Sequence, residues 1–302
     1  RALSTLIINL SGTFVMAQLN VDLSGKTALV TGGTNGIGKA AAIALARMGA
    51  EVVIVGRNRA LAESTVAEIK RSTGNQKVDH LVADLSVQAE VRKVAADFLN
   101  SGRPLHILLN NAGAMFPQRV ESIDGIEMTF ALNHLGYFLL TELLLDRLRQ
   151  SAPARIVNVA SMAHKGARNG MNFDDLEGRK SYAAFGAYGQ SKLANILFTR
   201  ELARRLQGSN ITVNCLHPGF VATRFAHANA IYNIAMTLMR PFQRSIAKGS
   251  QTSIYLCAAP EVANISGEYF ADCKVATPTP YGRDDNAAKK LWDISEQMVA
   301  LK

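Results

Sequence analysis

Residues 26–38 read KTALVTGGTNGIG, and this stretch decides the fold class. Residues 26–31 form a short apolar run that predicts a buried strand. The glycine-rich turn at 31–38 follows at once, and 36–48 then has the alanine-rich composition of a helix. A strand, a glycine-rich turn and a helix in this order favour a dinucleotide-binding α/β fold.

The rest of the chain alternates short apolar runs with longer amphipathic stretches. Further strands are expected at 51–56, 78–83, 105–110, 155–160, 211–216 and 267–270. Further helices are expected at 61–71, 87–100, 128–150, 182–206 and 248–258. This alternation predicts a Rossmann-type doubly wound parallel sheet with helices on both faces. Because no repeat or linker divides the chain, we expect an N-terminal extension at 1–20 and a single dinucleotide-binding catalytic domain at 21–302.

The composition of the 302 residues, 48% hydrophobic and 19% charged, is ordinary for a globular protein. The net charge is +9, but basic residues alternate with acidic ones and form no block, so nucleic acid is not an expected partner. The three cysteines, Cys215, Cys257 and Cys273, form no CxxC pair, and no set of His, Cys and acids has metal-ligand spacing. We therefore expect buried cysteines, no metal and a reducing, cytoplasmic location.

Residues 1–17 read RALSTLIINLSGTFVMA, an apolar stretch that polar residues interrupt. A membrane span needs about 20 predominantly apolar residues, so this stretch is too short and too polar to be a good one. It could be a weak anchor, the remnant of a targeting segment or a disordered extension derived from cloning, and we favour the last. Membrane association through this segment is the alternative to a cytoplasmic location.

The turn at 31–38 has its glycines in a GxxxGxG pattern rather than GxGxxG. Glycine lets the chain turn sharply and approach a pyrophosphate, and the following helix offers free N–H groups and a partial positive charge. On its own the pattern could mark a tight turn only, but its place between a strand and a helix favours cofactor binding. The candidate cofactor-binding residues here are Gly32, Thr34, Asn35, Gly36, Ile37 and Gly38.

The end of the second strand indicates which cofactor binds. An acid at this point binds the ribose 2′-hydroxyl of NAD, whereas an arginine suits the 2′-phosphate of NADP. The chain has Arg57 here and no acid, and Arg59 or Lys39 could assist in binding the phosphate. We therefore expect NADP(H), although Arg57 could also be a solvated surface arginine.

Tyr188 and Lys192 lie four residues apart in the expected helix 182–206 and share one face of it. An isolated tyrosine has a pKa near ~10, and a neighbouring ammonium lowers that pKa because it favours the phenolate. Such a pair can act as a general acid or base at a carbonyl. Without further residues, it could equally be a surface pair.

Other polar residues follow the expected strands at the carboxyl edge of the sheet, where open α/β sheets bind ligands. These are Asp84-Leu85, Asn110-Asn111-Ala112-Gly113, Ser161 and His217-Pro218-Gly219, with Asn133 in the helix at 128–150. Asp84 and Leu85 would lie near the adenine, although Asp84 or Ser86 could instead cap a helix. Together these neighbours make Tyr188 and Lys192 a candidate proton-transfer pair.

The motifs, taken in order, resemble those of the classical short-chain dehydrogenases/reductases over about residues 23–270. The resemblance implies hydride transfer between a nicotinamide and a carbonyl or alcohol carbon. Tyr188 would exchange the proton and Ser161 would hold the substrate oxygen. Lys192 would hold the nicotinamide ribose and lower the tyrosine pKa, and Asn133 would support a water relay. The resemblance also places these residues at the cofactor: Asn110, Asn111, Ala112, Gly113, Pro218, Gly219, Val221 and Thr223.

Finer similarity points to the retinol dehydrogenase branch of this family, through NHLG at 133–136, NVASMAH at 158–164 and SKLANILF at 191–198. That branch often carries a clear N-terminal membrane anchor, and residues 1–17 are not expected to form a clear one. Its loop after Gly219 varies freely, so retinoid specificity is not implied.

The segment at about 220–248 is expected to form a substrate lid, because it carries methionines and other apolar residues that adapt to hydrophobic ligands. It could instead be an amphipathic helix packed on the domain or on a partner subunit. His164, His217 and His227 are expected to be structural, since the tyrosine already supplies the proton.

Three hypotheses for the function follow. The first is an NADP(H)-dependent oxidoreductase that interconverts an apolar aldehyde or ketone and its alcohol. The second is a catalytically silent NADP-binding scaffold or regulator, which the intact Ser161, Tyr188 and Lys192 disfavour. The third is a carbon–carbon double-bond reductase of the same fold. The expected partner is a small hydrophobic carbonyl or alcohol substrate. The sequence is also compatible with a homo-oligomer.

Overall fold

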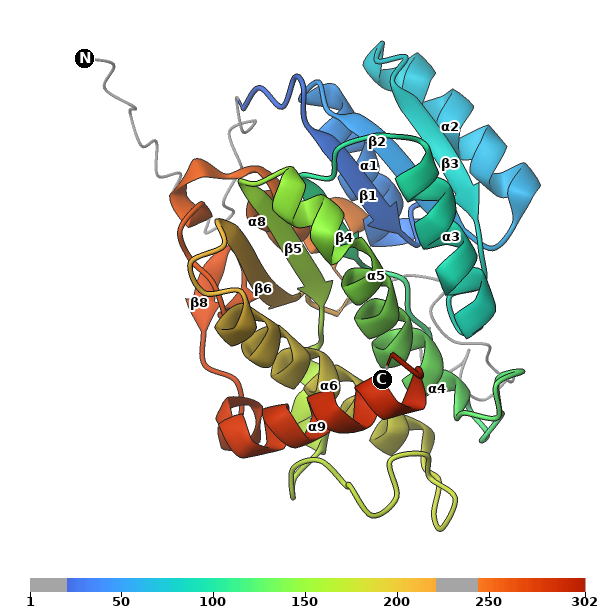
Figure 1. The fold of residues 1–302 in the computed structure, drawn as a ribbon, viewed down its shortest axis with the longest axis vertical. Helices are drawn as coiled ribbons and strands as arrows, with labels where there is room; N and C mark the ends of the chain where they lie inside the picture. The colour runs from blue at the N-terminus through green and yellow to red at the C-terminus, as the bar shows by residue number, and fades with distance from the viewer. Residues whose placement is uncertain (1–20, 221–243, 302) are drawn as a thin grey trace.

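The computed structural model describes residues 21–220 and 244–301. Within them an eight-stranded sheet has the order β3-β2-β1-β4-β5-β6-β7-β8, and its strands are parallel except for β8, which is antiparallel to β7 (Figure 1). The strands are β1 (Thr27–Thr31), β2 (Glu51–Gly56), β3 (Val78–Val82), β4 (Ile107–Asn110), β5 (Ala154–Val159), β6 (Ile211–His217), β7 (Tyr269–Ala271) and β8 (Lys274–Ala276). The strand order reverses between β1 and β4, and such a switch point is where doubly wound sheets bind dinucleotides.

Helices cover both faces of the sheet (Figure 1). One layer contains α1 (Gly36–Arg47), α2 (Arg59–Thr73) and α8 (Ile246–Ala258), which share a core with one side of the strands. The other layer contains α3 (Gln88–Asn100), α5 (Gly136–Gln150) and α6 (Ala184–Arg205), and α9 (Asp285–Met298) packs on α6. The predicted Rossmann-type fold is therefore confirmed.

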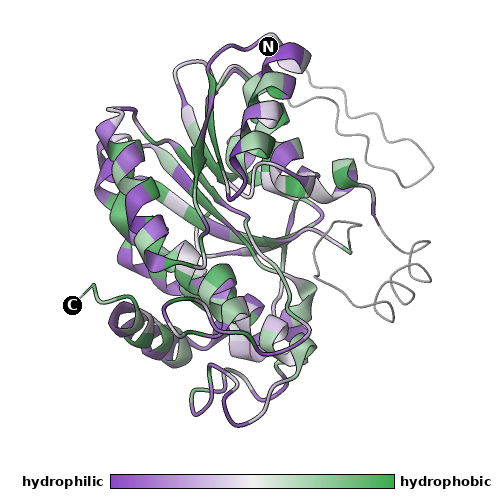
Figure 2. Cartoon of the chain, turned by 90° about the vertical axis from the view of Figure 1, so that its right-hand side faces the viewer, coloured by the Kyte–Doolittle hydropathy of each residue, from purple (hydrophilic) through white to green (hydrophobic). Residues whose placement is uncertain are grey.

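The central strands are apolar along their whole length because helices bury both of their faces. All five residues of β1 and the last five of β2 are buried. Figure 2 shows the same distribution, with hydrophobic strands inside and mixed helices around them. The sheet thus forms a rigid base, and the polar residues that end its strands are held at a common edge.

Two parts of the fold differ from the sequence-based prediction. The expected helix at 128–150 is divided into α4 (Met128–Phe130), a π-helical turn η1 (Ala131–Leu135) and α5. The strand β8 and the helix α9 were not predicted at all. The other predicted elements are confirmed with ends that shift by a few residues.

Among the described residues, the stretch Met128–Gln150 is long and apolar enough to cross a membrane. Most of it is buried inside the protein, as expected of a core helix. The N-terminal extension at 1–20 and residues 221–243 of the expected lid lie outside the described residues.

Candidate active site

The glycine-rich loop between β1 and α1 is folded tightly against its surroundings. Gly32 has a φ of +64°, and a Cβ on Gly38 would lie 2.4 Å from the Gly32 carbonyl oxygen. Asn35 begins α1 and accepts a hydrogen bond from the Gly36 N–H. Because the first turn of a helix leaves N–H groups without helical partners, the loop and the start of α1 form a site suited to a phosphate.

The residues after β4 hold this loop in place. The Thr31 hydroxyl oxygen accepts hydrogen bonds from the backbone N–H groups of Asn111 and Ala112, at 2.8 and 3.0 Å. The Asn111 side-chain amide donates to the Thr31 carbonyl oxygen at 2.8 Å. Asn111 and Ala112 therefore fix the shape of the glycine-rich loop.

The resemblance placed Asn110 at the cofactor, and the structure shows its side chain bound inside the protein. Its side chain is fully buried, and its amide donates to Thr141 Oγ1 and Asn158 Oδ1. Asn158 in turn donates to Thr199 Oγ1 at 2.9 Å. This network links β4, β5, α5 and α6 below the site, so Asn110 has a structural role.

The basic residues near the end of β2 are not equivalent. Lys39 forms an ion pair with Glu68 at 2.6 Å, and Arg59 lies 3.9 Å from Glu63. Arg57 is exposed directly after β2. Assistance from Lys39 or Arg59 stays a prediction, and Arg57 remains the main candidate for a 2′-phosphate because it directly follows β2.

Asp84 arranges its own turn. Its carboxylate accepts hydrogen bonds from the backbone N–H and the hydroxyl of Ser86, at 3.0 and 2.6 Å. Helix α3 begins after Val87, which makes no side-chain cap, so neither Asp84 nor Ser86 is the N-cap. Leu85 is buried, and its carbonyl oxygen would lie 2.6 Å from a Cβ on Gly136, where the loop meets the start of α5.

Tyr188 and Lys192 both lie on α6, with the lysine almost fully buried. The Lys192 Nζ lies 5.6 Å from the centre of the Tyr188 ring and donates to the Val159 carbonyl oxygen at 2.9 Å. Burial lowers the pKa of Lys192 to about 7. The amino group is thus held at the end of β5 beside the tyrosine, and its charge is sensitive to its surroundings near neutral pH.

Ser161 is brought to the same helix by the turn that follows β5. It caps the short 3-10 helix η2 (Met162–Gly166), where its hydroxyl oxygen accepts from the Ala163 N–H. A Cβ on Gly189 would lie 2.9 Å from the Ala163 carbonyl oxygen, so only glycine allows η2 to approach α6 this closely. Gly189 follows Tyr188 directly, and this contact joins the serine and tyrosine segments.

Asn133 lies in the π-helical turn and acts as a clamp. Its side chain accepts from the Ala114 N–H and donates to the Ala114 carbonyl oxygen, both at 2.9 Å. It also donates to Ser191 Oγ at 3.0 Å. π-Helical turns are uncommon and are frequent at functional sites. The clamp connects the loop after β4, the π turn and α6 around Lys192.

Gly113 completes this group. A Cβ on Gly113 would lie 3.0 Å from Asn133 Oδ1 and 3.5 Å from Lys192 Nζ. The structure therefore brings together Gly113, Asn133, Ser161, Tyr188 and Lys192 at the carboxyl edge of the sheet, next to the glycine-rich loop. An acid–base pair beside a dinucleotide crevice is the arrangement that hydride transfer to or from a carbonyl carbon requires.

Comparison with known proteins agrees with this geometry. The model of the short chain dehydrogenase family matches residues 26–231. The chain belongs to the short-chain dehydrogenase family. It is 42% identical to mouse retinol dehydrogenase 12 over 283 residues, which cover 94% of this chain and 89% of that protein. It is 44% identical to human retinol dehydrogenase 14 over 296 residues, which cover 92% of this chain and 88% of that protein.

Solved structures share this fold, and one of them is a short chain dehydrogenase. A short chain dehydrogenase from Burkholderia cenocepacia in complex with NADP has a TM-score of 0.66 and 28% identity, over 82% of this chain and 96% of that one. A structure from Mycobacterium paratuberculosis has a TM-score of 0.75 and 30% identity, over 94% and 97%. The protein is therefore an oxidoreductase of the short-chain dehydrogenase family, similar to the retinol dehydrogenases.

Two histidines of this short-chain dehydrogenase have structural partners near Ser161. His164 Nε2 accepts from the Thr279 N–H, so its Nδ1–H donates to the Ser161 carbonyl oxygen at 2.7 Å. His217 Nδ1 accepts from the Met162 N–H at 3.1 Å, and burial lowers its pKa to about 4. Both imidazoles support the position of Ser161, whereas His227 lies outside the described residues.

The residues after β6 are described only in part. Gly219 has a φ of +87°, and a Cβ there would lie 2.4 Å from the Arg244 side chain. Pro218 precedes it at the end of the strand, while Val221 and Thr223 lie outside the described residues. Within 21–220 and 244–301, no group of His, Cys, Asp and Glu could hold a metal ion.

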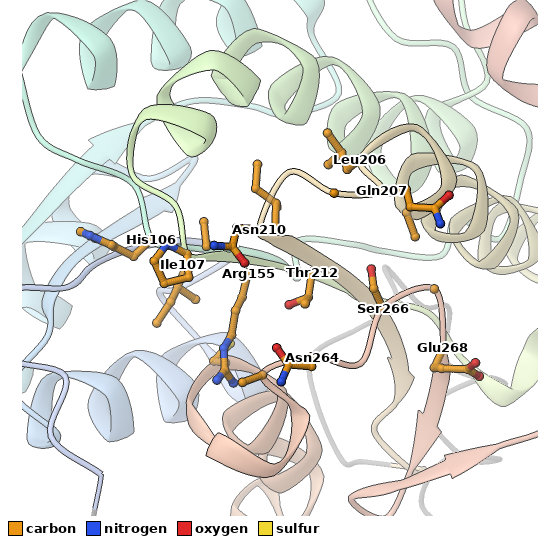
Figure 3. Close-up of a pocket in the computed structure, with 18 of the residues that line it drawn as sticks. His106, Ile107, Arg155, Leu206, Gln207, Asn210, Thr212, Asn264, Ser266 and Glu268 are labelled. Carbon is orange, nitrogen blue, oxygen red and sulfur yellow. The ribbon is translucent and has the colours of Figure 1, made fainter.

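A cavity of about 860 Å³ lies at the opposite edge of the sheet (Figure 3). Its lining includes His106, Arg155 and Asn210, which lie at the amino ends of strands. The Arg155 guanidinium donates to the carbonyl oxygens of Leu256 and Ala259 at the end of α8. The positive charge thus complements a helix C-terminus, and the cavity contains none of the candidate catalytic residues.

The supporting residues Thr31, Gly189 and Ser191 were not identified from the sequence. A glycine inside an expected helix is unfavourable, and this was the available signal for Gly189. Thr31 and Ser191 carry no such signal, because their function depends on contacts with distant segments.

Proposed function

We propose that this enzyme is an NADP(H)-dependent oxidoreductase that interconverts an apolar aldehyde or ketone and its alcohol. The observation that supports it most is the Lys192 amino group, buried beside the Tyr188 ring on the helix that η2 approaches. In this proposal Tyr188 exchanges a proton with the substrate oxygen and Ser161 hydrogen-bonds to that oxygen. Lys192, when charged, stabilises the phenolate form of the tyrosine.

Asn133 supports this pair indirectly in the proposed mechanism. All the hydrogen bonds described above for its side chain go to the protein itself. Its role is therefore to hold the backbone of the π turn and of Ala114 in place beside Lys192. A water relay to the lysine would be positioned by this fixed backbone.

The cofactor, when bound, would supply or accept the hydride at its nicotinamide. The tight glycine-rich loop and the open start of α1 suit its pyrophosphate, and Arg57 suits a 2′-phosphate. The absence of a side chain at Gly113 leaves room beside Lys192 for the ribose. The proposed contacts are Gly32, Thr34, Asn35, Gly36, Ile37, Gly38, Arg57, Asp84, Leu85, Asn111, Ala112, Gly113, Tyr188, Lys192, Pro218, Gly219, Val221 and Thr223.

The apolar nature of the substrate is supported by side chains next to the site. Met162, Phe185 and Phe220 have exposed fractions of 48%, 69% and 38%. They lie next to Ser161, one turn before Tyr188 on α6, and directly after Gly219. The names of the two retinol dehydrogenases point to the same class, an apolar alcohol and its aldehyde.

The test is NADPH oxidation with a panel of apolar aldehydes and ketones, with the products identified. We expect alcohol products, and Tyr188→Phe should lower kcat about 10²–10⁴-fold with little change in NADPH affinity. NADPH binding without turnover on any substrate would favour a scaffold. A product with a reduced carbon–carbon bond would favour the double-bond reductase.

For the cellular setting, we propose a cytoplasmic enzyme with one catalytic domain at 21–302 and a small hydrophobic substrate as its main partner. A homo-oligomer is compatible with this proposal, whereas nucleic acid is not a proposed partner. Attachment to a membrane through residues 1–20 is the alternative. Fractionation of cells that express the chain with and without these residues would distinguish the two locations.

A further inference from the structure

A second tyrosine lies beside the catalytic lysine. Tyr137 is the second residue of α5, directly after the π turn, and is only 1% exposed. The Lys192 Nζ lies over its ring, 5.8 Å from the ring centre, compared with 5.6 Å for Tyr188. Two aromatic rings, one from α5 and one from α6, therefore flank the same amino group.

The charge of Lys192 has little other support. Burial is what lowers the pKa of this lysine, and among the described residues no carboxylate offsets it. The Nζ has one hydrogen bond within the described chain, to the Val159 carbonyl oxygen. The two rings that lie over the amino group are those of Tyr188 and Tyr137. Other titratable groups on α6 and on the short elements beside it include His134 in η1, His164 and Lys165 in η2, and Arg200 and Glu201 further along α6. Burial lowers the pKa of His134 to about 4 and also lowers the pKa of His164, so near neutral pH neither imidazole adds a positive charge that would oppose the ammonium.

The face of an aromatic ring attracts a cation within about 6 Å of its centre, and the attraction is larger where water is excluded. We propose that Tyr137 is a positioning residue whose ring keeps the Lys192 amino group charged and seated beside Tyr188. This inference rests on the proposed function, because the charged lysine is what prepares Tyr188 for proton exchange.

The ring of Tyr137, and not its hydroxyl, has this role. The hydroxyl is buried and has no hydrogen-bond partner within residues 21–220 and 244–301. Burial also raises the pKa of Tyr137 well above its ordinary value, so its phenol stays neutral and does not compete with Tyr188 as a proton donor. Removing the hydroxyl should therefore leave the lysine unaffected, whereas removing the ring should not.

The sign of the effect follows from linkage. The ring favours the ammonium, so its loss should lower the Lys192 pKa further, by about one unit for a desolvated contact. At a pH near 7 this change reduces the ratio of charged to neutral lysine roughly tenfold. Turnover that depends on the ammonium would then begin to fall at a lower pH.

The experiment is an NMR titration of the full chain labelled with ¹³C at lysine Cε. The Lys192 signal is identified by its loss in Lys192→Arg. The pKa of Lys192 should fall by about one unit in Tyr137→Leu and stay within about 0.3 unit of the wild-type value in Tyr137→Phe. Phe98→Leu, which removes a fully buried ring from α3, serves as the matched control and should leave the Lys192 pKa unchanged.

An unchanged Lys192 pKa in folded Tyr137→Leu would overturn the proposal. An equal fall in Tyr137→Phe would also overturn it, since the hydroxyl would then be responsible. If Tyr137→Leu does not fold, Tyr137→Met gives the same measurement with a more adaptable side chain. The titration needs no substrate, so failure of the wild type to turn over any carbonyl refutes the proposed function without affecting this result.

Discussion

Replacing Asn133 by aspartate changes only the chemistry of the clamp, because the two side chains have the same shape. The Asn133 amide donates to the Ala114 carbonyl oxygen and to Ser191 Oγ. The Ser191 hydroxyl gives its own hydrogen to the Tyr188 carbonyl oxygen at 2.8 Å, so toward Asn133 it can only accept. A carboxylate at position 133 would therefore meet two acceptors at about hydrogen-bond distance.

The cost follows from these contacts. Each buried polar atom left without a partner costs about 1–3 kcal/mol, so Asn133→Asp should destabilise the protein by roughly 2–6 kcal/mol. For a domain of this size, that corresponds to a fall in Tm of roughly 5–20 °C. Burial raises the pKa of the new carboxyl in the folded state above its unfolded value. The folded state then binds the extra proton, so the destabilisation is present at neutral pH and decreases as the pH falls through that raised pKa.

Thermal unfolding at several pH values and steady-state kinetics at neutral pH measure both effects. Asn214→Asp is a matched control, because Asn214 is also buried, donates to the Ile265 carbonyl oxygen and accepts from the Glu268 N–H. Both variants should melt at a lower temperature, but only Asn133→Asp should lower kcat, by about tenfold or more. The proposed role of the Asn133 hydrogen bonds would be refuted if the Tm of Asn133→Asp stayed within about 1 °C of the wild-type value. An equal loss of kcat in the two variants would also refute it.

Three further predictions concern the cofactor and the C-terminal helix. Gly38→Ala places a Cβ 2.4 Å from the Gly32 carbonyl oxygen and should distort the glycine-rich loop. Titration calorimetry with NADPH should then show a Kd that is weaker by at least about tenfold. An unchanged Kd would contradict the role of this loop in binding the cofactor. Trp292→Ala removes a ring 4.9 Å from that of Phe138 and should lower the unfolding free energy in urea by about 3–5 kcal/mol, whereas a loss below about 1 kcal/mol would contradict the packing of α9. Arg57→Asp should shift the ratio of kcat/KM values toward NAD, and an unaltered preference for NADPH would exclude Arg57 from the 2′-phosphate site.

The strands could be predicted closely because their sequence and their environment agree. The run at 51–56, EVVIVG, has the bounds of β2, and both of its faces are covered by helices. Apolar β-branched residues ended by glycine are compatible with few other structures. The structure also places Ser161 after β5 and both Tyr188 and Lys192 on α6, as their positions in the sequence predicted, while their catalytic roles stay a prediction.

The π turn could not be predicted, because its cause is not local. Residues 131–135, ALNHL, fit an ordinary helix, and the wider turn is accompanied by contacts of Asn133 with Ala114 and Ser191. A pattern of 3.6 residues per turn does not reveal such a distortion. The helix α9 was missed for a similar reason. Its stability depends on burying Trp292 against Phe138 and Phe198, which lie far away in the sequence.

The neighbourhood of Lys192 shows why the site needs both kinds of information. The sequence identifies the lysine by its distance of four residues from Tyr188, and that spacing fixes only a shared helix face. Its charge depends instead on burial, on one carbonyl oxygen from β5 and on the Tyr137 ring from α5. A lysine with the same spacing on an exposed helix would keep its ordinary pKa and hold no fixed place. In the proposed mechanism, the tertiary packing around Lys192, more than the motif, therefore determines how effectively Tyr188 can exchange a proton.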